Sequence, residues 1–421
     1  MSWLYGQIKR WLRPHLKAIL LTWYRSINRE PWTVASKLPH APRIIHLSNH
    51  NGAIFFGYHD KTPFSGDNSK ILSMNVKHND TSPHSECKEI ELGYFHNLPS
   101  NDIENNFVKF SSTSTWCWQQ GCMLQWDPGN PNRRVFYNTL VDGQYGAHLF
   151  NIQKTKVVTS FPNPIYSISA DGKLAVSLNF SRLGRLRPGY GYSLLPDSTL
   201  NDPCPNDDGI YLMNLQTGKI ELLINLYELS LQVNCEPGDE HYINHASFSS
   251  DGLRIVFFHI WKLFNSNKRK IRFCSYELNT SKLSVIEDVR TTSHYCWRDD
   301  NSILATNVDQ FGTWRYTLYD LGNNIKKDLQ IDLQQDGHPM FSPVDKDIFI
   351  TDTYPDKRGD QHLCLVDLKN NKIYELIALY SPLRYRGQVR CDLHPRWDRR
   401  GNYVCVDSTS RGRREMIVVK V

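Results

Sequence analysis

The sequence predicts an all-β protein, a seven-bladed β-propeller with a short N-terminal helical extension. A phrase made of a histidine, an aromatic residue three positions later, a polar turn and a β-rich strand recurs along the chain. The recurrence interval, roughly 45 residues, is typical of propeller blades. Aromatic residues form 12% of the 421 residues, which suits β-structure. Helical patterning is scarce after residue 30.

Residues 1–40 are predicted to form an amphipathic helical extension, and residues 41–421 the propeller. Apolar residues recur at roughly helical spacing through MSWLYGQIKRWL, with basic residues between them. The longest apolar run, AILLTWY, is too short to span a bilayer and has no small-residue cleavage site. Such a helix either lies on a membrane surface or packs on its own domain, and we keep both interpretations for residues 1–30.

Four segments align without gaps around a histidine in the second half of the chain. They are NHASFSSDGLRIVFF, SHYCWRDDNSILATN, GHPMFSPVDKDIFIT and LHPRWDRRGNYVCVD, with histidines spaced 49, 44 and 56 residues apart. Looser relatives lie upstream in GYHDKTPFSGDNSKILSM, GCMLQWDPGNPNRRVFYN and PIYSISADGKLAVSL. Together the segments predict seven blades.

The last blade has only about three strands before the chain ends. A propeller closes its ring to remove sheet edges, so we expect the early segment RIIHLSN to supply the missing outer strand. Residues 181–209 are too long for a blade turn and are predicted to form an insertion. Long loops of this kind often carry function.

Equivalent positions at the start of each inner strand lie on one ring around a propeller axis. The four repeat histidines are therefore predicted to form an arc at one mouth of the channel: His245, His294, His338 and His394. Imidazoles suit divalent transition metals, and a neutral imidazole is the commonest general base near neutral pH. A repeat histidine can also bond within its own blade. Its restriction to four consecutive blades favours a functional cluster.

The insertion motif RLGRLRPGYGY combines arginines, which bind carboxylates, with tyrosines, which stack on sugars or move protons. Its candidate residues are Arg182, Arg185, Arg187, Tyr190 and Tyr192. Other residues expected near the same face are His59, Trp126, Asp352, Tyr354, Gln388, Arg390 and Asp392. Each of these is, taken alone, equally consistent with a loop or core position.

HASFS, SHYCW, GHPMFSP and DLHPRW resemble inner-strand motifs of the oligogalacturonate lyases and of the wider TolB-type propellers, over roughly residues 240–421. The resemblance implies cleavage of uronate-containing oligosaccharides by β-elimination, with a histidine base, an arginine and a divalent metal, usually Mn. By motif, His245 corresponds to the base and His294 to a metal ligand. The family's last ligand cluster has two histidines flanking one residue, where this chain has Asp392 and His394. The family's glutamine ligand has an approximate counterpart in Gln388.

We expect a carbohydrate-active propeller that acts on an acidic polysaccharide or oligosaccharide, with a divalent metal as cofactor. The expected catalytic residues are His245, Arg182, Arg187 and Tyr190. The expected metal ligands are His294, His338, His394 and Asp392. The expected substrate-binding residues are Arg185, Tyr192, Arg390, Gln388, Trp126 and His59.

Two other functions stay open. The first is a non-enzymatic scaffold or glycan-binding protein in surface-polysaccharide assembly, because the N-terminal half is similar to uncharacterised propellers of bacterial surface-polysaccharide gene sets. The second is a glycosyltransferase-like role. It has less support, because the sequence contains no nucleotide-sugar motif and no phosphate-cradling glycine loop. The net charge of +6 is mild, and we expect no nucleic-acid partner.

The ten cysteines form no CxxC motif, and several stand inside strand-like runs such as YVCVDS. Buried reduced thiols are typical of a reducing compartment. We therefore expect a cytoplasmic protein, with residues 1–30 as the contact if it sits peripherally at the inner membrane face. That location favours the scaffold over a lyase that degrades external polymers.

Overall fold

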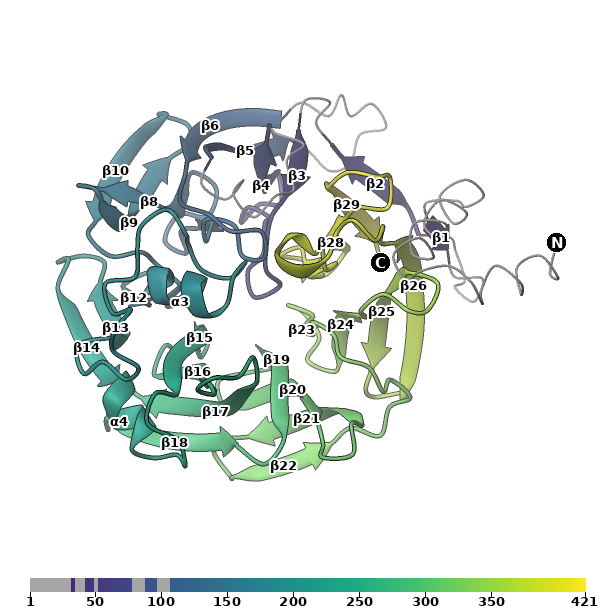
Figure 1. The fold of residues 1–421 in the computed structure, drawn as a ribbon. Coiled ribbons are helices and arrows are strands. Elements are labelled where there is room, and N and C mark those ends of the chain that lie inside the picture. The colour runs from purple at the N-terminus through teal and green to yellow at the C-terminus, as the bar shows by residue number, and fades with distance from the viewer. Residues whose placement is uncertain (1–31, 35–41, 49–51, 78–87, 97–106) are drawn as a thin grey trace, which may run out of the picture.

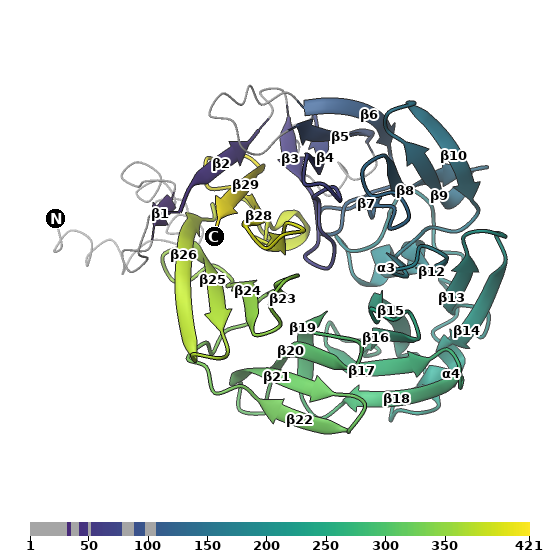
Figure 2. The same ribbon diagram turned by 180° about the vertical axis from the view of Figure 1, so that it is seen from behind.

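Seven small antiparallel sheets surround a central axis in the computed structural model, which describes residues 32–34, 42–48, 52–77, 88–96 and 107–421 (Figure 1). The view from behind shows the same closed ring (Figure 2). The predicted all-β seven-bladed propeller is confirmed. Most of the predicted extension at 1–40 lies outside the described residues, and within it residues 32–34 form a strand.

Blades I to VI each have four strands in sequence order from the axis outward, blade VII has three, and the last two blades each gain one strand from the N-terminal part of the chain. Blade I holds β3 (Ala53–Phe55), β4 (Lys70–Val76), β5 (Ile90–His96) and β6 (Phe107–Thr113). Blade II holds β7 (Gln125–Trp126), β8 (Arg134–Val141), β9 (Gln144–Asn151) and β10 (Lys156–Phe161). Blade III holds β11 (Ser167–Ile168), β12 (Leu174–Ser177), β13 (Gly209–Asn214) and β14 (Ile220–Asn225).

Blades IV and V contain the longest inner strands. Blade IV holds β15 (Glu240–Phe248), β16 (Arg254–Lys262), β17 (Arg269–Glu277) and β18 (Lys282–Glu287). Blade V holds β19 (Thr291–Trp297), β20 (Ser302–Val308), β21 (Trp314–Asp320) and β22 (Ile325–Asp328).

Blades VI and VII each take an outer strand from the N-terminal part of the chain. Blade VI holds β23 (Met340–Phe341), β24 (Ile348–Asp352), β25 (Asp360–Asp367) and β26 (Lys372–Tyr380), with β1 (Trp32–Val34) paired to β26. Blade VII holds β27 (Arg396–Trp397), β28 (Tyr403–Ser408) and β29 (Glu415–Lys420), with β2 (Ile44–Leu47) as its fourth strand. The predicted closure of the ring by RIIHLSN is confirmed.

The recurring polar turn between the first two strands of a blade has one structure in blades III and IV. Ser169 Oγ donates to Asp171 at 2.7 Å, and its oxygen accepts the backbone N–H of Leu174. Ser249 and Asp251 repeat this arrangement in blade IV. The glycine after each aspartate has a positive φ, 71° and 73°, which a glycine adopts without a steric penalty. The local chemistry of this turn explains why the sequence repeat could be recognised.

The insertion connects β12 to β13 and carries α3 (Phe180–Leu186). Asn179 caps α3, because its side chain accepts the backbone N–H of Arg182 at 2.9 Å. Two further short elements follow later in the chain, α4 (Leu226–Ser230) and the 3₁₀ turn η2 (Gly387–Val389). Among the described residues, no helix has the length and apolar character needed to cross a bilayer. None of the nine cysteines in the described part of the chain forms a disulfide bond.

Candidate active site

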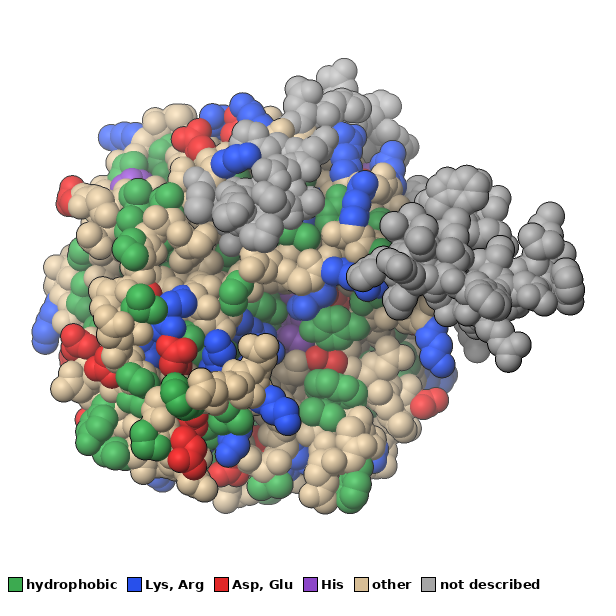
Figure 3. Space-filling view, in the orientation of Figure 1, with side chains coloured by type: hydrophobic (Ala, Val, Ile, Leu, Met, Phe, Trp, Pro, Cys, Tyr) green, Lys and Arg blue, Asp and Glu red, His purple; other side chains and the backbone are tan. Residues whose placement is uncertain are grey.

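Five buried histidines from five blades meet at the axis of the ring. The exposed fraction of each is 4% or less: His59, His245, His294, His338 and His394. The ring centroids of His294 and His338 lie 4.0 Å apart, and those of His338 and His394 lie 4.4 Å apart. In the space-filling view a histidine is visible in the hollow at the centre of the face, beside basic and acidic side chains (Figure 3). The structure thus brings the four repeat histidines together and adds His59.

Tyr58 fills the centre of this histidine cluster, and the sequence analysis missed it. Its ring stacks on His245 with a centroid distance of 4.6 Å, and its hydroxyl lies 3.4 Å from His245 Nε2. The same ring lies 4.8 Å from His394 and 6.0 Å from His338. Tyr58 therefore connects the predicted base to the predicted metal ligands.

Two of the histidines are turned toward the axis by an unusual backbone. His245 has a φ of 51° and His394 a φ of 45°, the left-handed region that non-glycine residues adopt at a cost of about 1–3 kcal/mol. Side chains satisfy both freed backbone N–H groups: Tyr166 Oη accepts from His245 at 3.0 Å, and Asp352 accepts from His394 at 3.1 Å. Strain held in place by specific partners is a common feature of functional sites.

The Nδ1 atoms of four cluster histidines each face a fixed oxygen. Asp336 lies 3.1 Å from His294 Nδ1, and Asp352 lies 2.8 Å from His338 Nδ1. For the other two histidines the oxygen is a backbone carbonyl. The Gly57 oxygen lies 2.8 Å from His394 Nδ1, and the Pro339 oxygen lies 3.1 Å from His59 Nδ1. A carbonyl only accepts, so Nδ1 carries the proton and Nε2 of the neutral ring keeps its lone pair. This is the arrangement seen in metal-binding histidines.

Three residues of the described chain have ligand atoms within 4.8 Å of one another and could hold a metal: His338, Asp392 and His394. The Nε2 atoms of His338 and His394 are buried and have no hydrogen-bond partner among the described residues. Such orphaned polar atoms require an explanation, and a metal ion supplies one. His294 was also predicted as a ligand. It stands beside His338 but does not belong to this triad.

The carboxylates and the burial set the charge of the cluster. Burial and, next, the neighbouring His338 lower the pKa of His294 against the raising effect of Asp336, and the same two causes lower the pKa of His394. For His338 burial acts in the same direction, but Asp352 and the nearby carboxylates outweigh it and raise the pKa. The acidic groups around His338 therefore favour a positive charge at this position.

Two arginines and two tyrosines cover the other side of the cluster. The guanidinium of Arg187 lies 4.1 Å from the ring centroid of Tyr190, and the Tyr190 ring lies 5.6 Å from His245. Arg390 lies 3.4 Å from Tyr190 Oη, 2.7 Å from Asp392 and 5.2 Å from the Tyr354 ring. Burial and, next, the charge of Arg187 hold the pKa of His245 well below its usual value of 6.5. His245 is therefore a neutral acceptor at neutral pH.

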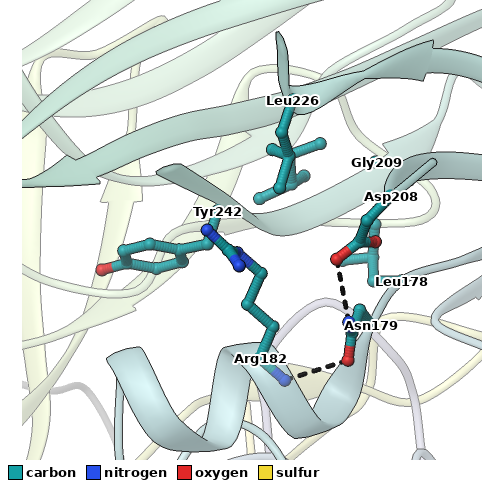
Figure 4. Close-up of a pocket in the computed structure, with 8 residues that line it drawn as sticks. Leu178, Asn179, Arg182, Asp208, Gly209, Leu226 and Tyr242 are labelled. Atoms are coloured by element: carbon teal, nitrogen blue, oxygen red, sulfur yellow. Dashed lines mark hydrogen bonds between the residues drawn. The ribbon is translucent and has the colours of Figure 1, made fainter. Parts of the chain in front are cut away.

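Arg182 lies away from the cluster and holds the insertion in place. Its guanidinium donates to the carbonyls of His241, Thr199, Asp202 and Pro203, and its exposed fraction is 1%. Figure 4 shows its side chain extending from α3 toward Tyr242, with Asn179 and Asp208 alongside. The structure therefore does not bring Arg182 to the cluster with the other expected catalytic residues, and its donors are occupied by backbone carbonyls.

The remaining predicted residues divide between the site and the core. Arg185 pairs with Asp197 at 2.9 Å and with Glu240, and neither of these partners belongs to the histidine cluster. Tyr192 is buried against Phe180 with ring centroids 4.3 Å apart, and Trp126 is buried and donates to the carbonyl of Pro63. The structure thus places these three expected substrate-binding residues outside the histidine cluster. Gln388 is half-buried on η2 beside Gly189 of the insertion, at the edge of the site.

Asp208, beside Arg182, predicts a pH-dependent stability. Burial raises its pKa from 3.8 to about 6, against the lowering effects of Asn179 and Arg182. The folded protein holds this proton more tightly than the unfolded chain, so ionisation of Asp208 costs stability as the pH rises from 3.8 to about 6. We expect Asp208→Asn to raise the free energy of unfolding by about 3 kcal/mol above this window and to change it little below. Urea unfolding at about pH 4 and about pH 8 measures the difference, and equal effects at both values would contradict it.

Several site residues escaped the sequence analysis although a signal was present. Asp336 stands two residues before His338, as Asp392 stands two residues before His394, so both blades share an Asp-x-His pattern. Tyr58 directly precedes His59 in GYHDK, the segment that opens the first blade. Tyr166 carried no local signal, because its hydroxyl meets His245 only in the folded ring.

The comparisons with known proteins agree on the fold. No protein-family model matches the chain, and no curated protein matches it. An oligogalacturonate lyase in complex with manganese is similar in structure, with a TM-score of 0.65 and 11% identity over 93% of this chain and 96% of that one. The oligogalacturonate lyase of Vibrio parahaemolyticus gives a TM-score of 0.64, with the same identity and coverage. At this identity the likeness shows the architecture alone: the chain has the seven-bladed propeller fold found in the oligogalacturonate lyases.

Proposed function

We propose that this propeller is a carbohydrate-active protein that cleaves a uronate-containing polysaccharide by β-elimination. One observation carries the proposal. A neutral histidine, His245, lies beside a cation, Arg187, on one side of Tyr58, and a metal-type triad lies on the other. The likeness in fold to oligogalacturonate lyases supports the same assignment.

The reaction requires a base, a partner for the uronate carboxylate and a proton for the leaving oxygen. Arg187 and Arg390 are the partly exposed cations over the cluster, so the carboxylate would pair with them. His245 Nε2 would take the C5 proton, the C–H electron pair would form the C4=C5 double bond, and the C4–O4 bond would break. Tyr58 Oη, 3.4 Å from this nitrogen, would give its proton to O4 and regain one from His245.

The residues present fit a divalent metal. His338, His394 and Asp392 would hold it, since two buried Nε2 lone pairs and a carboxylate suit Mn and similar ions. When bound, such an ion would act as a Lewis acid that polarises the substrate carboxylate. Arg390 already pairs with Asp392, so it balances the charge of this carboxylate in the absence of an ion.

Metal binding gives a direct prediction. We expect His338→Ala to abolish binding of Mn, because it removes an orphaned ligand atom, and Asp352→Asn to weaken it about 10- to 100-fold, because Asp352 fixes the His338 tautomer. Elemental analysis and calorimetric titration of chelator-free protein measure both. His362→Ala, at a partly exposed histidine paired with Glu375, is the control. Equal Mn binding by all four proteins would refute the triad.

The proposed activity is tested by incubating the purified protein with Mn and a panel of uronate polymers. A new ultraviolet absorbance from the conjugated double bond is the expected result. No absorbance with any polymer, under conditions where Mn binds, would refute the lyase.

A second candidate is a glycan-binding propeller without catalysis. The specific observation in its favour is that Tyr58 stacks directly on His245 and leaves the histidine only 4% exposed. This alternative predicts tight binding of uronate oligomers to the wild-type protein with no product, so binding and absorbance measured together separate the two functions.

A further inference from the structure

We propose that three exposed arginines beside the channel mouth form a strip that binds an extended anionic polysaccharide. The strip consists of Arg384 and Arg386, on the loop that joins β26 of blade VI to β27 of blade VII, and of Arg411, on the β28–β29 loop of blade VII. It would give this protein a preference for uronate oligomers of several residues over dimers. The identity of the ligand rests on the proposed function, whereas the strip itself rests on the contacts below.

The loop that carries Arg384 and Arg386 is anchored along its backbone. Gln119 Nε2 donates to the carbonyls of Gln388 and Arg390 at 3.0 and 2.8 Å. The buried guanidinium of Arg414 donates to the carbonyls of Val389 and Arg390 at 3.0 and 2.7 Å. The two exposed arginines therefore stand on a backbone that is already ordered, which lowers the entropic cost of binding.

The second loop, which carries Arg411, joins the first. Tyr385 Oη donates to the carbonyl of Gly412 at 3.2 Å, and the guanidinium of Arg384 lies over the Tyr385 ring at 5.1 Å. A Cβ added at Gly412 would lie 3.4 Å from Arg384 Nη2. The three cations are thus carried by two loops in contact.

The charge of this surface has one sign. Residues 381–391 and 408–414 contain no aspartate or glutamate. The adjacent Glu415 is buried, lies 3.2 Å from His46 and accepts from Arg411 at 3.4 Å. Figure 3 shows basic side chains next to the central hollow on the side of blade VII. A surface of this kind attracts a polyanion.

The strip continues into the mouth. After Arg386, the same loop passes through η2, which packs against Gly189 of the insertion, and ends at Arg390, which pairs with Asp392 of the site. A chain whose terminal uronate pairs with Arg390 and Arg187 would carry its next carboxylates outward over the strip. Guanidinium groups bind carboxylates in a bidentate geometry, which favours uronates over neutral sugars.

The test uses the His245→Asn protein, which binds without turnover, and compares galacturonate dimer with hexamer by calorimetry. The triple variant Arg384→Gln/Arg386→Gln/Arg411→Gln should lose about 3- to 100-fold in affinity for the hexamer, since each exposed pair contributes roughly 1.5- to 5-fold. Affinity for the dimer should stay unchanged. The matched control removes three exposed cations at the β16–β17 turn, Lys268→Gln/Arg269→Gln/Lys270→Gln, and should leave both affinities unchanged.

Each outcome decides a different claim. Unchanged hexamer affinity in the triple variant, or an equal loss for dimer and hexamer, would overturn the strip while the lyase proposal stands. An arginine-dependent hexamer affinity, together with a wild-type protein that forms no product when Mn is bound, would support the strip and refute the lyase. Failure of every uronate oligomer to bind, or arginine-dependent binding of single-stranded DNA in place of the hexamer, would overturn the assigned ligand.

Discussion

Replacement of His245 by asparagine should lower turnover of a uronate polymer by about 10²- to 10⁴-fold, the usual contribution of a general base. Asparagine tolerates the left-handed φ of 51° at this position, so the substitution removes the base with little strain. Binding of Mn should persist, because His245 does not belong to the metal triad. The rate of appearance of the double bond, measured at saturating substrate, gives the size of the effect.

The pH profile separates this chemical role from a structural one. Burial and Arg187 hold the pKa of His245 well below 6.5, so the wild-type rate should stay level through that pH and fall only under more acidic conditions. Arg187→Gln removes the second cause and should move the acid limb toward higher pH. His362→Asn is the control for histidine loss in general. A His245→Asn protein with wild-type turnover would remove His245 from the mechanism.

Replacement of Asp407 by alanine should destabilise the fold by about 3–5 kcal/mol, because it leaves the buried cation Arg396 without its partner. The two side chains are 2% and 0% exposed and lie 3.0 Å apart. Asp407 also accepts the backbone N–H groups of Phe56 and Gly57, at 3.1 Å each, and so positions the loop that carries Tyr58. Because the Gly57 carbonyl of this loop holds Nδ1 of His394, loss of Mn binding should accompany the loss of stability.

Urea unfolding monitored by tryptophan fluorescence measures this effect. Lys173→Ala, which breaks the exposed pair between Lys173 and Asp171, should cost no more than about 1 kcal/mol. The double variant Arg396→Leu/Asp407→Asn should recover part of the stability, since the cation is gone and an oxygen still faces the two amides. A cost for Asp407→Ala as small as that for Lys173→Ala would show that the pair does not hold the loop.

The fold was predictable because the blade is a local unit that repeats its own turn. The Ser-x-Asp-Gly turns around Gly172 and Gly252, and the strand that follows each, carry their signal within about a dozen residues. Ring geometry then placed the repeat histidines at the axis without any contact information. The missing strand of blade VII was predictable for a different reason, because an open sheet edge had to be paired.

The detailed chemistry of the site was only partly predictable, because it depends on contacts between distant segments. Arg182, Arg185 and Arg187 follow one another at short intervals in one motif, yet only Arg187 reaches the cluster. The carbonyls that occupy Arg182 come from residues up to 59 positions away. Tyr58 meets His245 across 187 residues. Spacing along the chain cannot distinguish such partners.

Blade VII is assembled from the two ends of the chain, with β2 beside β29 and His46 3.2 Å from Glu415, 369 residues later. Because β2 and β29 lie far apart in the sequence, this sheet can exist only after both strands have been synthesised. Blades I to V are each continuous in the sequence and can form as they are translated, whereas Arg396, His394 and Tyr58 take their final positions only when β2 and β29 meet. A chain released early would therefore be nearly all propeller by mass and yet have neither a sealed ring nor an assembled histidine cluster.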